Sequence, residues 1–489
     1  MRIISTISLL LVSAWVLAQP TLLVPPGMDS LDFGSGALLV VGGDAVVSRD
    51  AVLDFQSDGG FEIGGNLVIE DGSEVNFANG NETDPESMRG LHVGGTFQNF
   101  GSLLLGTNTS SVLSGDVTLS PASITNSDGI LEVAGNWNSL GQFVNGSGSE
   151  FIAAGSADQL IEFVSVFFPR LTVAGPGVST LRAESIIIEE NGQLDFAGGV
   201  LRVAESTDFL VETGATITGG SDDSYFDGRL RIASEGSDDL NFPIGDGTQY
   251  NPIALRDIEA GTGSYTIAAE LTSPNTLDPV PAEDVVGVSS RNMWTVQLEN
   301  GAVDSATLYI NFADEDLSDE AFVNFNPVNA EFVVPVVTVA DSLPGEFVSL
   351  GASSLEASDS LTFGMITSEE KIAFTVSTKY IALGRAPVIS PNLRYFIPDV
   401  FAPGDFRPEN QTMRVFGEFI DESADFEFTI YNEFNSQMYT TNSFREANEV
   451  GWDGTFNGVE QPSGTYMWIL RATIDQVRYE DRGLFYLVR

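Results

Sequence analysis

The chain has 489 residues, of which 43% are apolar, so it can bury a large core and is long enough for about three domains. Acidic residues outnumber basic ones by 69 to 21, for a net charge of -48, and such a surface repels phosphate backbones, which excludes nucleic acid as an expected partner. No cysteine is present, which excludes disulfides, a thiolate nucleophile and cysteine-based zinc sites.

Residues 1–18 have the pattern of a signal peptide. Arg2 gives a positive start, an apolar run follows, and Ala18 provides the small residue expected at the cleavage site. The apolar run is shorter than a membrane span requires, and no other candidate span follows it. We therefore predict cleavage after Ala18 and an exported protein, extracellular or at the cell surface, that is not an integral membrane protein.

A 22-residue repeat marks the next region, 19–239. Leu-Asp-Phe occurs at 31–33 and 53–55, and Val-Asn-Phe follows at 75–77. Glycine pairs keep the same interval at 42–43 and 64–65, and a third pair comes eight residues late, at 94–95. A short period with two or three strands predicts a parallel β-solenoid, because each coil can bury its apolar face only by stacking on its neighbours.

The repeat predicts how individual residues are placed. We expect Leu91 and Val93 to point inward and His92 outward, because side chains alternate along a strand. The paired glycines are expected to bend the backbone at a corner and to adopt φ values that other residues resist. The polar segment 79–90 is expected to be a loop inserted into one coil. The repeat fades after about Gly106 and returns later.

From residue 240 the pattern changes to longer alternating strands separated by turns. This pattern predicts an antiparallel β-sandwich over 240–384. Segment 385–394 contains Pro387 and Pro391 and is predicted to be a linker. With the short β-branched and aromatic runs found throughout, the expected fold class is all-β.

Candidate sites in the first two domains are few. Asp314, Asp316 and Asp319 could supply oxygen ligands to Ca²⁺, but they lack the glycine and the spacing of an EF-hand loop, so a solvated acidic loop is favoured and no cofactor is expected. Phe97 follows the glycine pair 94–95, and Trp137 follows Ala134-Gly135 at the equivalent place. They could stack on a sugar or fill the solenoid there, and their repeated position favours filling.

No catalytic motif of the nucleophile-elbow, zinc-protease or phosphate-loop type is present, and the only histidine is the outward His92. We therefore expect no enzymatic activity. Solenoids also host glycan-degrading enzymes and carbohydrate-binding proteins, and these two classes stay open as alternatives. Acids clustered with arginine along a groove would indicate an enzyme, and exposed flat aromatics a binding protein.

The last region, 395–489, is rich in turn signals. Asp453-Gly454 and Asn457-Gly458 predict tight turns, and Pro462-Ser463-Gly464 turns the chain into a further strand. In that strand we expect Tyr466, Trp468 and Leu470 to alternate inward. We expect Trp452 to pack in the core beside one of the turns.

This region resembles the gliding motility-associated C-terminal domain, the type B sorting domain of cargo proteins of type IX secretion in Bacteroidetes. The residues that match the pattern of that family are Phe401, Pro403, Ile430, Tyr431, Asn432, Trp452, Asp453, Gly454, Pro462, Ser463, Gly464, Tyr466 and Arg489. Two departures are Glu433, where the family has arginine, and the loop 404–411, which has lost most of its Gly-Asp pattern.

The resemblance implies an Ig-like β-sandwich whose folded surface is read by the outer-membrane secretion machinery. The expected location is therefore extracellular or at the cell surface, and the resemblance implies no particular ligand. Among the three classes weighed above we favour an adhesive or structural surface protein, with surface glycans or other surface proteins as further partners.

Overall fold

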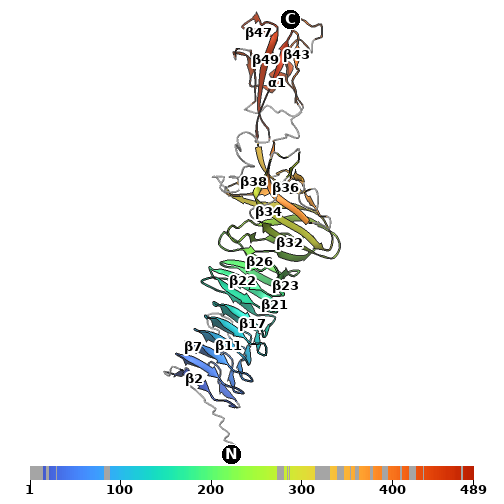
Figure 1. The fold of residues 1–489 in the computed structure, drawn as a ribbon. Coiled ribbons are helices and arrows are strands. Elements are labelled where there is room, and N and C mark those ends of the chain that lie inside the picture. Colours follow the sequence, from blue (N-terminus) through green and yellow to red (C-terminus); the bar gives the residue numbers. More distant parts are fainter. Residues whose placement is uncertain are drawn as a thin grey trace, which may run out of the picture. The chain divides into compact units, whose positions relative to one another are not determined.

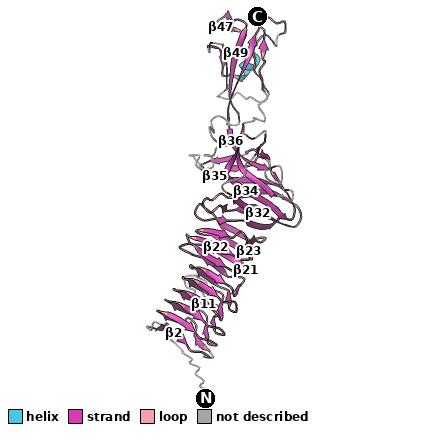
Figure 2. Ribbon diagram, in the orientation of Figure 1, coloured by secondary structure: helices cyan, strands magenta, loops and turns pink. Residues whose placement is uncertain are grey.

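The structure is a computed structural model that describes residues 15–17, 21–28, 30–81, 89–272, 280–282, 285, 287–313, 331–338, 346–352, 354–357, 363–374, 378–387, 395–407, 410–417, 426–432, 434, 436–474 and 477–489. Nearly all of its elements are strands (Figures 1 and 2), as predicted. The chain forms two compact units, the first built mostly from residues up to Leu383 and the second mostly from Gly384–Arg489.

The first unit begins with a β-solenoid of about 10 turns, whose stacked coils are visible in Figure 1. Parallel strands form three faces. The first face contains β1 (Trp15–Leu17), β4 (Leu38–Val41), β7 (Gly60–Ile63), β10 (Leu91–Val93), β13 (Ser110–Leu113), β16 (Ile130–Val133), β19 (Glu150–Ala153), β21 (Ser165–Val173), β23 (Ser185–Phe196), β25 (Asp208–Val211), β26 (Thr216–Gly219) and β28 (Leu230–Glu235). The second contains β2 (Thr21–Val24), β5 (Asp44–Val47), β8 (Leu67–Ile69), β11 (Phe97–Asn99), β14 (Val117–Leu119), β17 (Trp137–Ser139), β20 (Gln159–Glu162), β22 (Val178–Arg182), β24 (Val200–Val203), β27 (Phe226–Asp227) and β30 (Ile244–Gly245). The third contains β3 (Leu31–Phe33), β6 (Val52–Phe55), β9 (Glu74–Phe77), β12 (Ser102–Leu105), β15 (Ile124–Ser127) and β18 (Gln142–Asn145).

The 22-residue spacing is the distance along the chain between residues stacked in successive coils. Phe33 pairs with Phe55, and Phe55 pairs with Phe77. Their rings are stacked, with centroids 4.5 and 4.7 Å apart and planes within 8° of parallel. Equal spacing therefore places identical side chains above one another in the core, where offset aromatic stacking adds to the burial of apolar surface.

The coil length changes along the solenoid. Val93 pairs with Ile63, 30 residues earlier, which confirms an eight-residue insertion; most of the inserted segment lies outside the described residues. Val93 then pairs with Leu113, and Leu113 with Val133, at intervals of 20. The coils thus continue through the part of the sequence where the repeat fades. The repeat fades there because the coil length drops from 22 to 20 residues, so the earlier interval is lost.

Side-chain directions follow the prediction. Leu91 and Val93 are at most 1% exposed, and His92 between them is half-buried. Phe97 and Trp137 are each 1% exposed and fill the interior, which confirms filling over sugar stacking. The aromatic rings in the solenoid thus contribute to its core.

The glycine pairs lie at bends between the first and second faces, as predicted, but the prediction about their φ values is wrong. Gly64, Gly65, Gly94 and Gly95 do not adopt positive φ. A Cβ on Gly94 would instead lie 2.7 Å from the carbonyl oxygen of Gly64, and one on Gly95 would lie 2.8 Å from the carbonyl carbon of Gly65. The glycines are needed because the backbones of successive coils touch at this corner and leave no room for a side chain.

A ladder of polar side chains follows the glycine pairs. Asp44 Oδ1 accepts a hydrogen bond from the backbone N–H of Asn66 at 2.8 Å, and Asn66 Oδ1 accepts one from the N–H of Thr96 at 2.8 Å. Asp116 and Asn136 continue the pattern in later coils. Each acceptor satisfies a backbone donor of the next coil at the corner, where the strand pairing is interrupted.

An antiparallel sandwich completes the first unit. The first solenoid face continues into one of its sheets, because β28 pairs with β25 in parallel and with β32 antiparallel. That sheet adds β32 (Ser264–Thr272), β33 (Val280–Pro281), β34 (Gly287–Asn300), β36 (Glu331–Thr338), β37 (Glu346–Ser349) and β41 (Thr378–Pro387). The other sheet contains β29 (Leu240–Phe242), β31 (Ile253–Ala260), β35 (Val303–Ala313), β38 (Ser354–Ala357), β39 (Phe363–Thr367) and β40 (Ile372–Ala373).

Two predicted domain boundaries fall inside continuous strands or sheets. β30 pairs with β27, so the second solenoid face reaches Gly245, past the boundary expected at 239. β41 extends to Pro387, three residues into the predicted linker, and the rest of that linker lies outside the described residues. Solenoid and sandwich therefore share hydrogen-bonded sheet structure.

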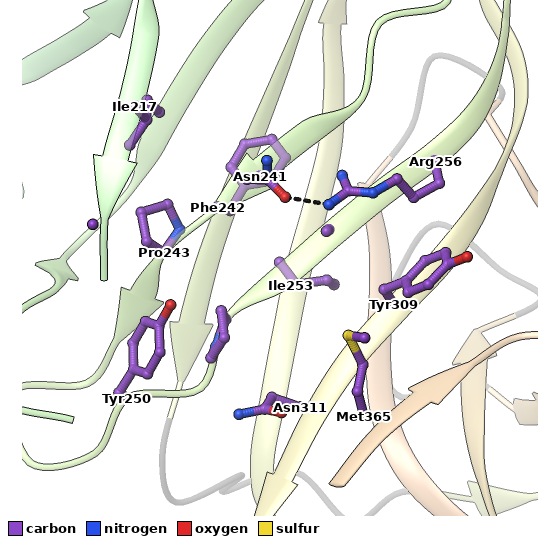
Figure 3. Close-up of a pocket in the computed structure, with 13 residues that line it drawn as sticks. Ile217, Asn241, Phe242, Pro243, Tyr250, Ile253, Arg256, Tyr309, Asn311 and Met365 are labelled. Carbon is purple, nitrogen blue, oxygen red and sulfur yellow. Dashed lines mark hydrogen bonds between the residues drawn. The ribbon is translucent and has the colours of Figure 1, made fainter. Parts of the chain in front are cut away.

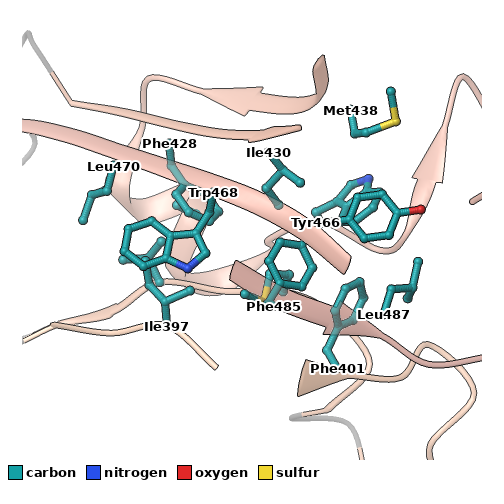
Figure 4. Packing of buried hydrophobic residues seen from close by; sticks show 14 of the residues in the cluster. Ile397, Phe401, Phe428, Ile430, Met438, Tyr466, Trp468, Leu470, Phe485 and Leu487 are labelled. Atoms are coloured by element: carbon teal, nitrogen blue, oxygen red, sulfur yellow. The ribbon is translucent and has the colours of Figure 1, made fainter. Parts of the chain in front are cut away.

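The second unit contains a five-stranded sheet in the order β43-β50-β49-β45-β46. Its strands are β43 (Val400–Phe401), β45 (Glu427–Tyr431), β46 (Gln437–Thr441), β49 (Gly464–Ile474) and β50 (Val477–Leu487). It also contains the pairs β42 (Tyr395–Phe396) with β44 (Phe416–Gly417) and β47 (Thr455–Phe456) with β48 (Val459–Glu460), and the helix α1 (Phe444–Glu449). Tyr466, Trp468 and Leu470 point into one apolar cluster as predicted (Figure 4), while the Ig-like sandwich stays a prediction.

Candidate functional site

The sequence motifs of the second unit meet around Trp452. Its ring is 2% exposed and lies against Phe401, Tyr466 and Phe485, with centroids 5.7, 5.2 and 6.2 Å away. The three partners come from β43, β49 and β50, so this contact joins strands that are distant in sequence. Burying such large aromatic side chains is the main source of stability for a unit of this size.

The turn after Trp452 is closed by local hydrogen bonds. Asp453 Oδ1 accepts hydrogen bonds from the backbone N–H and the hydroxyl of Thr455, at 2.9 and 2.8 Å. The indole Nε1 of Trp452 donates to the carbonyl oxygen of Thr455 at 2.7 Å. Gly454 has a φ of +79°, which favours glycine because a Cβ is strained there. Each residue of the Trp-Asp-Gly motif therefore has its own role: Trp452 packs in the core, Asp453 closes the turn, and Gly454 permits the backbone conformation.

The Pro-Ser-Gly turn lies beside it. The hydroxyl of Tyr466 donates to the carbonyl oxygen of Pro462 at 2.9 Å, and Gly464 is the first residue of β49. The hydroxyl oxygen of Ser463 accepts a hydrogen bond from the backbone N–H of Arg489 at 2.9 Å.

Arg489 joins the two turns. Its Nη2 donates to the carbonyl oxygen of Gly454 at 2.7 Å and its Nε to that of Gln461 at 2.7 Å, while Nη1 lies 3.3 Å from the Glu460 carboxylate. The guanidinium has five N–H donors in a fixed plane and can therefore hold several acceptors at once. The predicted residues Trp452, Asp453, Gly454, Pro462, Ser463, Gly464, Tyr466 and Arg489 thus gather at one end of the unit.

The remaining matched residues lie in the same unit. Ile430 is buried in the core and Tyr431 is half-buried on β45. Asn432 Oδ1 accepts hydrogen bonds from the N–H groups of Phe434 and Ser436, at 3.0 and 2.9 Å, and so closes the β45–β46 hairpin. Pro403 Cγ lies 3.1 Å from the position of a Cβ on Gly454. Glu433, the first departure from the family pattern, lies outside the described residues.

The altered loop 404–411 is organised around Asp405. Its carboxylate binds the guanidinium of Arg407 and the amide of Asn410, each at 2.9 Å. The hydrogen bond from Arg407, followed by that from Asn410, holds the pKa of Asp405 well below its usual value. Within the described part of this loop, a side-chain cation therefore satisfies the carboxylate.

Comparisons with models of protein families, with curated proteins and with solved structures found no match. Among the described residues, no helix is long and apolar enough to cross a membrane. Asp314, Asp316 and Asp319 lie outside the described residues, and those that are described contain no group of three or more acids or histidines that could hold a metal ion.

A charged cleft of about 530 Å³ lies where the last coils meet the sandwich in the first unit. Glu299 binds Arg229 at 2.7 Å and Arg231 at 2.6 Å, and Arg231 also binds Asp208. Burial acts to raise the pKa of Glu299, but the hydrogen bonds from the two arginines outweigh it and lower that pKa. Glu270 lines the same cleft, and burial raises its pKa.

These ion pairs link solenoid strands to the sandwich. Asp208 and Arg231 belong to β25 and β28 of the solenoid, and Glu299 belongs to β34 of the sandwich. Glu299 therefore links the sandwich to the solenoid through Arg229 and Arg231, and Asp208 binds Arg231 within the solenoid. The sequence held no signal for this cluster, because its members are separated by up to about ninety residues.

Proposed function

We propose that this chain is an exported, non-enzymatic protein of the cell surface, adhesive or structural, and that its second unit is the signal for its export through type IX secretion. The signal peptide directs the chain across the inner membrane. The outer-membrane machinery then reads the folded surface of the C-terminal unit.

One observation carries this proposal. The residues that match the family pattern form one connected arrangement around Arg489. Its guanidinium donates to the carbonyl oxygens of Gly454 and Gln461, and its backbone N–H donates to the hydroxyl oxygen of Ser463. An export signal recognised as a folded shape needs such a rigid surface, since binding is strongest when little ordering is required on contact. The unit also has a buried core of its own.

The charged cleft bears on the alternative of a glycan-degrading enzyme, because acids cluster with arginine there. Burial raises the pKa of Glu270, as a proton donor requires, but Glu299 is held in its ionised form by two arginines, and this favours the non-enzymatic proposal. A glycan-degrading enzyme needs one carboxylic acid that gives up a proton and a second carboxylate that faces the sugar. Surface glycans or other surface proteins are the partners that we propose for the first unit.

The decisive experiment removes residues 395–489 and follows the protein in a bacterium with type IX secretion. We expect the truncated chain to stay in the periplasm while the full chain reaches the surface or the medium. A fusion of residues 385–489 to a periplasmic reporter protein is the complementary test, and we expect it to be exported. Export of the truncated chain, or retention of a folded fusion, would contradict the proposal.

A further inference from the structure

A cleft of about 250 Å³ opens on the outer side of the sandwich sheet that contains β31 and β35, beside the end of solenoid strand β26. Figure 3 shows Tyr250 and Tyr309 flanking it, with Asn311 between them. Asn241, Arg256 and Met365 also line it. The cleft therefore combines two aromatic rings with amide groups, which is the composition of small-molecule sites that hold a ligand through few polar contacts.

Tyr250 is held in position from behind. Its ring stacks on Tyr225, which is 2% exposed, with centroids 5.9 Å apart. A Cβ on Gly220 would lie 2.7 Å from the Tyr250 hydroxyl, so glycine leaves room for that group. Burial raises the pKa of Tyr250, and the hydroxyl therefore remains a hydrogen-bond donor.

Arg256 positions the second ring. Its guanidinium lies 5.7 Å from the centroid of Tyr309. It also donates to Asn241 and to the carbonyl oxygens of Leu240 and Leu255, and it lies 3.3 Å from the carboxylate of Asp239. Most of its donors are thus used and its charge is balanced, so it supports Tyr309 instead of attracting an anion.

The polar groups that face the cleft are available for a ligand. Tyr309 and Asn311 are two residues apart on β35 and therefore point to the same side of the strand. That side faces outward, because Ile310 between them is fully buried. Among the described residues, no hydrogen bond ends on the side-chain amide of Asn311 or on the hydroxyl of Tyr250. An amide offers both donors and an acceptor, and a tyrosine hydroxyl offers one of each.

We propose that this cleft binds a neutral saccharide. The C–H faces of a sugar ring pack against Tyr250 and Tyr309, and its hydroxyl groups exchange hydrogen bonds with the Asn311 amide and the Tyr250 hydroxyl. We propose a neutral ligand because the positive charge of Arg256 is already balanced by the carboxylate of Asp239. This site adds a ligand to the proposed surface protein and does not depend on how the protein is exported.

The test uses the purified full chain in isothermal titration calorimetry. The probes are neutral hexasaccharides of glucose, mannose, galactose and xylose, with hexagalacturonate as the charged comparison. We expect at least one neutral probe to bind. We expect Tyr309→Ala and Asn311→Ala each to weaken that binding about tenfold. Tyr250→Phe, which keeps the ring, is expected to weaken it less than Tyr250→Ala.

Tyr486→Ala is the matched control, because Tyr486 is an exposed tyrosine of the second unit. Asn311→Ala changes only an outward side chain, so equal thermal unfolding of this variant and the parent separates lost binding from lost folding. Absence of binding by every neutral probe overturns the proposal. So does binding that the cleft variants leave unchanged, and so does binding of hexagalacturonate alone.

Discussion

The guanidinium of Arg489 donates a hydrogen bond to the carbonyl oxygen of Gly454 at 2.7 Å, so the last residue of the chain closes a turn 35 positions earlier. The same side chain donates to Gln461, and its backbone N–H donates to Ser463. The terminal arginine therefore connects the end of β50 to both motif turns. Replacing Arg489 tests whether the stability of this end of the unit depends on its side chain.

We predict that Arg489→Ala lowers the local stability of the second unit by about 1 to 3 kcal/mol, because the carbonyl oxygens of Gly454 and Gln461 lose a charged donor. Hydrogen exchange of amides in β49 and β50 measures that loss directly. Arg445→Ala is the control: it removes the same charge from an exposed i,i+4 pair and is expected to cost about 0.5 kcal/mol or less. Equal protection in the two variants would count against a connecting role for Arg489.

Trp452→Phe is predicted to destabilise the second unit by about 1 to 3 kcal/mol. The change leaves a gap among Phe401, Tyr466 and Phe485, and it leaves the carbonyl oxygen of Thr455 without its indole donor. The measurement is again amide exchange in β49 and β50. If export follows the folded shape of the unit, the exported fraction should fall in proportion. A destabilised variant that is exported as fully as the parent speaks against recognition of the folded surface.

The solenoid was predictable where the coils have equal length. Phe33, Phe55 and Phe77 stack at identical intervals, and such an interval is visible in a sequence. The coils around Leu113 and Val133 were harder to recognise because their interval is 20 residues. The packing reason for Gly94 could not be derived at all, since it depends on how closely two backbones approach in three dimensions.

The candidate sites were predictable to different degrees. Trp452 and Asp453 stand in a short motif with turn chemistry, so their positions could be predicted from local patterns. The partners of Arg489 are backbone carbonyl groups, which every residue carries and no sequence pattern distinguishes. The cleft between Tyr250 and Tyr309 is lined from β26, β29, β31, β35 and β39, and the register in which such strands pair leaves no local signal in the sequence.

The contact between coils predicts the effect of a single methyl group. Gly95→Ala places a Cβ 2.8 Å from the backbone of Gly65 and should destabilise the neighbouring coils by about 1 to 3 kcal/mol. Gly148→Ala is the matched control, because a Cβ there meets nothing within 4 Å and its φ is not positive. Amide exchange in β8 and β11 measures the difference. A Gly95→Ala protein as protected as the Gly148→Ala protein would contradict backbone contact as the reason for glycine.

The ion pairs of Glu299 predict how the first unit responds to acid. The pKa of Glu299 is lower in the folded protein than its ordinary value of 4.5, because Arg229 and Arg231 stabilise the ionised form against the effect of burial. A lowered carboxyl pKa stabilises the fold fully above the ordinary value, and this contribution is lost as the pH falls through the folded pKa. Glu299→Gln should therefore lower stability at neutral pH by on the order of 1 kcal/mol and flatten its decline in acid.

Urea unfolding of the full chain between about pH 3 and pH 7, followed by amide exchange in β28 and β34, measures this dependence. Glu235→Gln makes the same chemical change at an exposed position of β28 and is expected to keep the parent slope. Glu270 affects the pH dependence of stability with the opposite sign. Its pKa is raised in the folded protein, so it stabilises the folded state at low pH, and this stabilisation is lost as the pH rises above 4.5 and through the folded pKa. The parent and the Glu299→Gln chain both contain Glu270, so its contribution cancels when the two are compared. The variant lacks the lowered pKa of Glu299, and its stability in acid should therefore decline less than that of the parent. An unchanged decline would mean that the ion pairs with Arg229 and Arg231 do not hold the solenoid to the sandwich.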